Sequence, residues 1–167
     1  MQEWQLRKMN TIDAQIAYLV GLNGRLSNRE IARRIGVAEG TVRQRLGRLI
    51  ESGALRITAQ ANIEAYPETY LAIVGVKIDG RRLNECAAQI EKLPSVLNTM
   101  VVTGRYDIIT TILAPSRQTL VDFVTDQLSK IQGVRDSETY VVLKNFGQWI
   151  PADKLCRMIE DFKDERK

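Results

Sequence analysis

Histidine is absent from this sequence, and cysteine occurs twice, as Cys86 and Cys156. The lack of histidine removes the commonest general base and excludes Ser-His-Asp and Cys-His catalysis. Without histidine and without a cysteine cluster, the sequence also lacks a donor set for zinc. We therefore expect free thiols, no catalytic residue, no metal, no cofactor, and a protein that is not an enzyme.

Long hydrophobic runs are also missing. No apolar stretch approaches the roughly 20 residues that a membrane helix needs. The first ten residues, MQEWQLRKMN, lack the apolar core of a signal peptide. Hydrophobic residues make up 44% of the chain and charged residues 26%, as in ordinary globular proteins. We expect a cytoplasmic protein without membrane contact.

Positive charge is concentrated at the start of the chain. Residues 1–60 hold ten basic and five acidic residues, a net charge of +5, whereas the remainder carries −1. A basic segment of this kind favours binding to a polyanion such as nucleic acid.

Residues 27–52, SNREIARRIGVAEGTVRQRLGRLIES, have the pattern of two short helices around a tight turn. Ser27 and Glu30 are spaced as a capping box, in which each side chain accepts from the other residue's backbone N–H. Gly36 is placed to end the first helix. The second helix is expected to turn Val42, Leu46, Leu49 and Ile50 inward and Thr41, Arg43, Gln44, Arg45 and Arg48 outward.

A further helix, capped by Asn10 or Thr11, is expected to run to about Leu22, with residues 1–9 and Trp4 as a loose helical lead-in. Its inner positions are Ile12, Ile16, Leu19 and Val20. The resulting three-helix unit, residues 1–55, is typical of a helix-turn-helix DNA-binding domain. The alternative is a helical hairpin with a solvated basic face.

The pattern becomes strand-like after a linker placed at 56–68. Strands are expected at 70–78, 96–103, 108–113 and 134–143, and helices at 83–93 and 116–131. The order βαββαβ over 69–145 predicts a ferredoxin-like domain, so the fold class is α+β. The sheet face without helices is expected to form a homodimer. A C-terminal extension, 146–167, is expected to be helical, with an inner stripe of Leu155, Met158, Ile159 and Phe162.

The ordered set of segments resembles the Lrp/AsnC (leucine-responsive regulatory protein/asparagine regulator) family. The segments are IDAQI with Asp13, NGRLSNREIARRIGV at 23–37, TVRQRLGRLIESGAL at 41–55, TGRYD at 103–107 and IQGVRDSETYVVL at 131–143. The resemblance implies a transcription regulator that binds pseudo-palindromic double-stranded DNA. It also implies dimers through the second, RAM, domain, assembly to octamers, and an amino acid or small metabolite as effector.

By this resemblance the recognition helix spans about 39–52, with Thr41, Arg43 and Gln44 at base edges and Arg45 and Arg48 at phosphates. Arg29 and Arg34 add flanking phosphate contacts or are simply solvated. Ala38-Glu39-Gly40 departs from the family's Ser-Pro-Ser, and Ala38 cannot cap the helix, a loss of about 1 kcal/mol. The residues expected to contact DNA are Arg25, Ser27, Asn28, Arg33, Glu39, Gly40, Thr41, Arg43, Gln44, Arg45 and Arg48.

The resemblance also implies an effector site at the loop 104–107. There, backbone N–H groups around Gly104 would meet a carboxylate, and Asp107 would meet an ammonium group. The alternative is a plain hairpin turn. The residues expected at this site are Met100, Thr103, Gly104, Arg105, Tyr106, Asp107, Ser137 and Thr139.

Two other functions remain as alternatives. An effector-independent architectural DNA-binding protein would show weak sequence preference and steep salt dependence. A sirohaem decarboxylase-like enzyme is disfavoured, because such relatives of the family use histidine and this chain has none.

Overall fold

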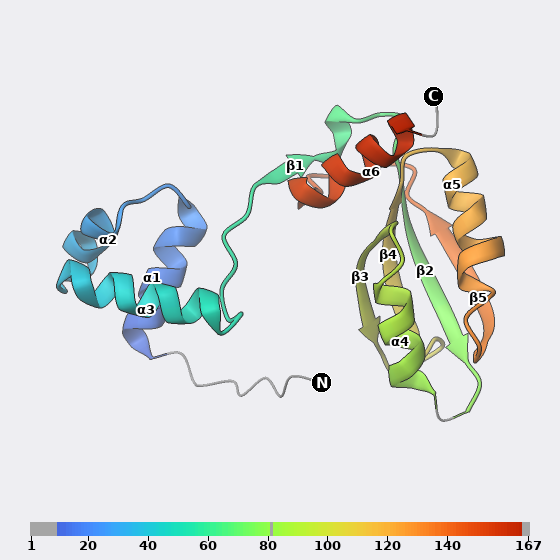
Figure 1. The fold of residues 1–167 in the computed structure, drawn as a ribbon, viewed down its shortest axis with the longest axis horizontal. Helices are drawn as coiled ribbons and strands as arrows, with labels where there is room; N and C mark the ends of the chain where they lie inside the picture. The colour runs from blue at the N-terminus through green and yellow to red at the C-terminus, as the bar shows by residue number, and fades with distance from the viewer. Residues whose placement is uncertain (1–9, 81, 165–167) are drawn as a thin grey trace. The chain divides into compact units, whose positions relative to one another are not determined.

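The computed structural model describes residues 10–80 and 82–164, with side chains described as far as Met158. The expected lead-in at 1–9, with Trp4, and the side chains of Ile159 and Phe162 lie outside this description. The chain divides into two compact units, Met1–Thr58 and Ala59–Lys167 (Figure 1). None of the helices described is long and apolar enough to cross a bilayer.

The first unit consists of α1 (Thr11–Leu22), α2 (Asn28–Ile35) and α3 (Glu39–Glu51). The side chain of Asn10 caps α1 by accepting from the N–H of Asp13 at 2.9 Å. Gly36 ends α2 in the left-handed conformation, at φ +72°. The three helices enclose a small core of Ile16, Val20, Ile31, Ala32 and Val42.

One inward position of α3 is wrong in the sequence prediction. Val42 and Leu49 are buried, but Ile50 is 45% exposed. Successive helical residues are rotated by about 100°. Ile50 therefore turns away from the core that Leu49 enters.

The second unit contains a four-stranded sheet of the order β3-β4-β2-β5, with all neighbours antiparallel. The strands are β2 (Tyr70–Ile78), β3 (Val96–Val101), β4 (Ile108–Ala114) and β5 (Val134–Val141). Helix α4 (Leu83–Glu91) packs on β3 and β4, and α5 (Arg117–Asp122) packs on β4. The fold is α+β, with the predicted βαββαβ order, although β3 and β5 each end two residues earlier than expected.

The expected helix at 116–131 is not uniform. Helix α5 is followed by a π-helical turn, η2 (Phe123–Leu128). The hydroxyl of Thr125 donates to the Val121 carbonyl, and that of Ser129 donates to the Thr125 carbonyl. Such bonds offer these carbonyls a donor other than the backbone N–H groups of a regular helix. Four apolar side chains of this stretch are buried, Leu120, Phe123, Leu128 and Ile131, and Val124 is half-buried.

The expected linker at 56–68 contains ordered structure. Strand β1 (Gln60–Asn62) pairs antiparallel with β6 (Trp149–Pro151), and the 3₁₀ turn η1 (Ile63–Ala65) follows β1. Ile63 is only 5% exposed. The range from Ala59 onward therefore belongs to the second unit, because burying Ile63 removes apolar surface from water.

The C-terminal helix α6 (Ala152–Asp164) lies beside the β1–β6 pair (Figure 1). Leu155 and Met158 of α6 are buried with Leu71 and Leu113. These two leucines lie on the sheet face opposite to α4, since their neighbours Ala72 and Ile112 enter the core with Cys86 and Ile90. The expectation that this second face has no helix is therefore wrong at the Leu71–Leu113 end.

The rest of this second face, which we call the open face, carries exposed apolar side chains. Gly75 pairs with Ile109 and Glu138, and Ile109 pairs with Met100. Paired residues of neighbouring strands share a face. Ile73, Met100 and Tyr140 are exposed there. This surface is consistent with the expected self-association face, reduced by the part that α6 covers.

Candidate nucleic-acid interface and ligand site

Helix α3 presents polar side chains on the side opposite to its buried residues. Val42 and Leu49 are buried, whereas Arg43, Gln44 and Arg48 are exposed and Thr41 is half-buried. Of the residues expected at base edges, Arg43 and Gln44 are therefore accessible to a ligand. Arginine and glutamine can each form two hydrogen bonds with a base edge in the major groove.

The N-terminus of α3 has the features expected from its unusual sequence. Ala38 precedes the helix without a side-chain hydrogen bond to its first turn. A Cβ atom added at Gly40 would meet no atom within 4 Å. The start of α3 is thus narrow and open, which is compatible with close approach to a polyanion.

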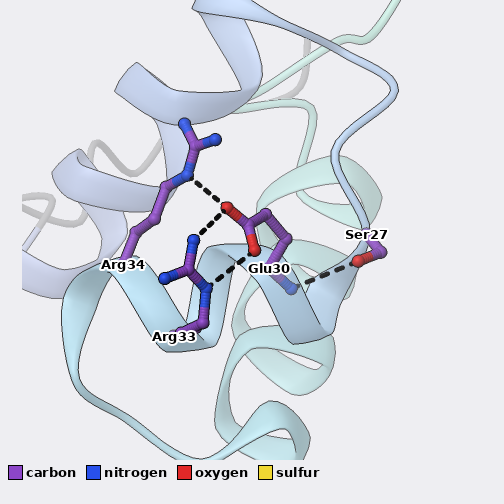
Figure 2. A network of polar contacts seen from close by, with 4 residues as sticks. All are labelled: Ser27, Glu30, Arg33 and Arg34. Carbon is purple, nitrogen blue, oxygen red and sulfur yellow. Dashed lines mark hydrogen bonds and ion pairs between the residues drawn. The ribbon is translucent and has the colours of Figure 1, made fainter.

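Helix α2 begins with half of the predicted capping box (Figure 2). The hydroxyl of Ser27 accepts from the N–H of Glu30 at 3.2 Å. The prediction of the reciprocal bond, from the Ser27 N–H to the Glu30 carboxylate, is wrong. This carboxylate instead accepts from Arg33 and Arg34. Its two oxygens are satisfied by these charged donors, which form stronger hydrogen bonds than a neutral N–H.

The ion pairs around Glu30 shift its acid–base equilibrium. The hydrogen bonds from Arg33, and then those from Arg34, lower the pKa of Glu30 to about 2. The same carboxylate raises the pKa of Arg33. Two of the arginines expected at phosphates are therefore paired with a single carboxylate.

Two residues of α3 that were expected at DNA are also paired. Arg43 Nη2 lies 3.1 Å from Glu39 Oε1, four residues earlier on an exposed surface. Arg45 Nη1 lies 3.0 Å from Asp13 Oδ1 of α1 and is half-buried. In the described part of the chain, by contrast, the side chains of Arg25, Arg29 and Arg48 are exposed and have no carboxylate partner. These three are the arginines most readily available to phosphates.

The loop of the expected effector site is tied to the sheet. Gly104 adopts φ +124°, a conformation that suits glycine. The carboxylate of Asp107 accepts from the N–H of Ile78 through Oδ2 at 2.8 Å, and the Asp107 N–H donates to the Val76 carbonyl. Asp107 therefore holds the end of the loop against β2, and one of its carboxylate oxygens is used for this contact.

The ring of Tyr106 covers Gly75 on the open face. A Cβ atom at position 75 would lie 2.5 Å from Tyr106 Cδ2, so only glycine leaves room for the ring. The Tyr106 hydroxyl lies 3.2 Å from that of Tyr140. The guanidinium of Arg105 lies 5.4 Å from the Tyr106 ring centroid and 3.0 Å from Glu138 Oε2. We call Arg105, Tyr106, Glu138 and Tyr140 the loop cluster.

The loop cluster contains two residues that the sequence analysis missed, Glu138 and Tyr140. The Glu138 carboxylate, as a hydrogen-bond acceptor, raises the pKa of Tyr140, and partial burial adds to the shift. The signal that could have found them is the alternation of side chains along a strand. Once Tyr106 is placed over Gly75, the strand paired with β2 must contribute residues 138 and 140 to that face.

The same alternation separates two of the expected effector residues from the others. Ser137 pairs with Val76 and Thr139 with Val74, and both valines are buried in the core beneath the helices. Met100 and the loop cluster lie on the open face. The sheet therefore stands between Ser137 and Thr139 on one side and Met100 and Tyr106 on the other.

Two protein-family models match this chain. Residues 9–56 match a winged helix-turn-helix DNA-binding domain, and residues 71–148 match the Lrp/AsnC ligand-binding domain. The first range covers α1 to α3, and the second covers the four-stranded sheet with its loop cluster.

Relatives match over most of the chain. The HTH-type transcriptional regulator FL11 of Pyrococcus furiosus is 32% identical over 137 residues, which are 81% of this chain and 90% of that protein. An uncharacterised HTH-type transcriptional regulator of Pyrococcus abyssi is 35% identical over 81% of this chain and 92% of its own length.

Solved structures also match. A transcriptional regulator of Neisseria meningitidis in complex with L-Met is 26% identical, with a TM-score of 0.68, over 87% of this chain and 98% of that one. Escherichia coli AsnC has a TM-score of 0.65 at 21% identity, over 80% of this chain and 91% of its own, and so supports the fold.

Proposed function

The chain belongs to the Lrp/AsnC family of DNA-binding transcription regulators, and from this premise we propose that it reads DNA through α3 and responds to a small metabolite through its second unit. Paired copies of α3 would enter successive major grooves of a pseudo-palindromic site. A ligand at the second unit would shift the assembly or the spacing of the paired units, and with it the DNA affinity.

The observation that supports the DNA interface is the exposure of Arg43 and Gln44 on a helix whose other side is buried. Direct readout needs side chains that reach base edges while the helix itself is held by its core. Arg43 must exchange its contact with Glu39 for a contact with DNA. Exposed ion pairs of this type contribute only about 0.3–0.5 kcal/mol. A contact with a base therefore readily offsets the loss of the Arg43–Glu39 pair.

Arg43→Ala is expected to remove specific DNA binding while the oligomer remains intact. A lost bidentate contact costs roughly 1–3 kcal/mol at each contacted base pair, so affinity for a sequence selected by the wild type should fall about tenfold or more. Binding is measured by fluorescence anisotropy on a duplex enriched from a random pool. Lys130→Ala is the matched control, since Lys130 is similarly exposed and pairs with Asp126 four residues earlier. Normal binding by Arg43→Ala would show that a different surface of α3 reads DNA.

The effector proposed is an amino acid or a similar small metabolite bound at the loop 103–107. The similarity of residues 71–148 to a ligand-binding domain supports this, as does the regulator of Neisseria meningitidis that was solved with L-Met. Thr103, Gly104, Arg105, Tyr106, Asp107 and Met100 remain the proposed contacts, together with Glu138 and Tyr140. Ser137 and Thr139 lie on the other face of the sheet, so they would contact the effector only around the edge of β5.

Thermal unfolding against a panel of common amino acids and metabolites tests the effector. A ligand that binds the native state raises the apparent melting temperature. At a free concentration a hundredfold above its dissociation constant, it adds about 2.7 kcal/mol to the free energy of unfolding. Asp107→Asn, which keeps an oxygen for the Ile78 N–H but loses the charge, should abolish this rise. Asp136→Asn is the control, because Asp136 also accepts a backbone N–H, from Ser137. An undiminished rise in Asp107→Asn would remove Asp107 as the ammonium partner.

We also propose a homodimer through the open face, assembling further to an octamer. The exposed Ile73, Met100 and Tyr140 support self-association there. The second candidate function, an effector-independent architectural protein, would bind selected and random duplexes alike. A wild type that prefers its selected duplex by less than about tenfold would favour that candidate.

A further inference from the structure

Asp13 and Arg45 form an ion pair that joins two helices of the first unit. Arg45 Nη1 lies 3.0 Å from Asp13 Oδ1, and their side chains are only 30% and 20% exposed. The pairs Arg33–Glu30, Arg34–Glu30 and Arg43–Glu39 instead lie within single helices, three or four residues apart. The Asp13–Arg45 pair therefore constrains tertiary structure, whereas the others act on local side-chain positions.

The carboxylate of this pair is held by a well-anchored element. Asp13 lies in the first turn of α1, and its N–H donates to the capping side chain of Asn10 at 2.9 Å. One turn later, Ile16 is buried in the core that also contains Val42 of α3. The carboxylate is thus presented to α3 from a helix that is fixed by a cap and by packing.

The pair has a geometric consequence for α3. Arg43 and Gln44 directly precede Arg45, and successive helical residues are rotated by about 100°. Holding Arg45 against α1 therefore restricts the rotation of α3 about its axis. That rotation decides the directions in which Arg43 and Gln44 leave the helix.

The pair also has an electrostatic consequence. A guanidinium that is half-buried beside a carboxylate is drawn away from solvent, and its charge is balanced locally. Arg45 is then withheld from phosphates, in contrast to Arg25, Arg29 and Arg48. Non-specific DNA affinity grows with each phosphate that a cation neutralises.

We propose that Asp13 is a specificity-determining positioning residue, which sequesters Arg45 from the DNA backbone and sets the rotation of α3. This deepens the proposed function and rests on its DNA interface. The pair would restrain binding to random sequence and keep Arg43 and Gln44 aligned for base readout. Breaking it would make the protein a stronger but less discriminating DNA binder.

The test uses the full-length Asp13→Asn variant, a mixed-sequence duplex, and a duplex that the wild type has enriched from a random pool. Asparagine keeps the shape of Asp13 and releases the charge of Arg45. On the mixed duplex, log K against log salt should steepen by about 0.9 for each protomer bound. That corresponds to a roughly three- to fourfold larger loss of affinity between 50 and 200 mM salt. The preference for the enriched duplex should fall.

Two further variants separate the two roles. Arg45→Gln breaks the same pair without releasing a cation, so preference should fall while the salt slope stays that of the wild type. Glu51→Gln makes the same change of net charge at an exposed position of α3 and should leave the preference unchanged. A shallower slope in Arg45→Gln would show that Arg45 already contacts phosphate, which overturns the sequestration.

The remaining outcomes are also decisive. An Asp13→Asn slope and preference equal to those of Glu51→Gln would reduce the effect to net charge and overturn the proposal. If Asp13→Asn fails to fold by circular dichroism, Arg45→Gln decides: an unchanged preference overturns the proposal, and a reduced preference at the wild-type slope supports it. A wild type whose binding to the mixed duplex is independent of salt would refute the proposed DNA interface itself.

Discussion

Replacing Phe123 with alanine is expected to lower the free energy of unfolding by about 3–5 kcal/mol. Phe123 is fully buried at the junction of α5 and η2, packed in the cluster that joins both helices to the sheet. Removing the ring loses the free energy of burying its apolar surface. It also leaves a cavity, which the surrounding side chains can fill only in part. Domains of this kind are stable by about 5–15 kcal/mol, so the loss removes a large share of the total stability.

Urea denaturation followed by circular dichroism measures this loss. Val121→Ala is the control, because Val121 lies two residues earlier on α5 and is 44% exposed. Its effect should stay within about 0.5 kcal/mol. A Phe123→Ala variant as stable as Val121→Ala would mean that the register of η2 against the sheet differs from the one described.

Gly75→Ala is expected to cost roughly 1–3 kcal/mol, the range for overpacking a filled site. The added Cβ would lie 2.5–2.8 Å from three atoms of the Tyr106 ring, which must move away from β2. The displaced ring loses its contact with the Tyr140 hydroxyl. Denaturation measures the cost, and a change in near-ultraviolet circular dichroism would report the movement of the ring.

A double-mutant cycle shows whether the ring is the cause. A Tyr106→Ala background removes these three ring atoms, so Gly75→Ala should then cost less than about 0.5 kcal/mol. Coupling of 0.5–3 kcal/mol is usual for residues in contact. An equal cost in both backgrounds would place the strain in the β2 backbone and not in the Tyr106 contact.

Features that depend on a few neighbouring residues were predictable from the sequence. The cap of Asn10, the cap of Ser27 and the left-handed Gly36 occur where local chemistry requires them. The buried positions of α1, α4 and α5 follow helical spacing. Helix ends and amphipathic faces arise from backbone groups and side chains within one or two turns, which the sequence displays directly.

Choices between competing partners were not predictable. Glu30 lies near the N-terminus of its own helix and near two arginines. Its carboxylate accepts hydrogen bonds from the two arginines and not from the Ser27 N–H. Ile50 and Leu49 are both apolar, but the structure buries Leu49 and leaves Ile50 45% exposed. Ile63 looked like part of a polar linker, but the β1–β6 pair carries it into a cluster with α6.

The sequence by itself determined the α+β class, the three-helix unit, the βαββαβ order and the resemblance to the Lrp/AsnC family. Tertiary structure alone decided which side chains meet: Arg45 with Asp13 across 32 positions, Tyr106 over Gly75, and Glu138 and Tyr140 in place of Ser137 and Thr139 beside the loop. The physical reason is range. Periodicity and capping act within a few residues, whereas strand register and helix packing set contacts between segments far apart, and a shift of one residue in a strand exchanges its two faces.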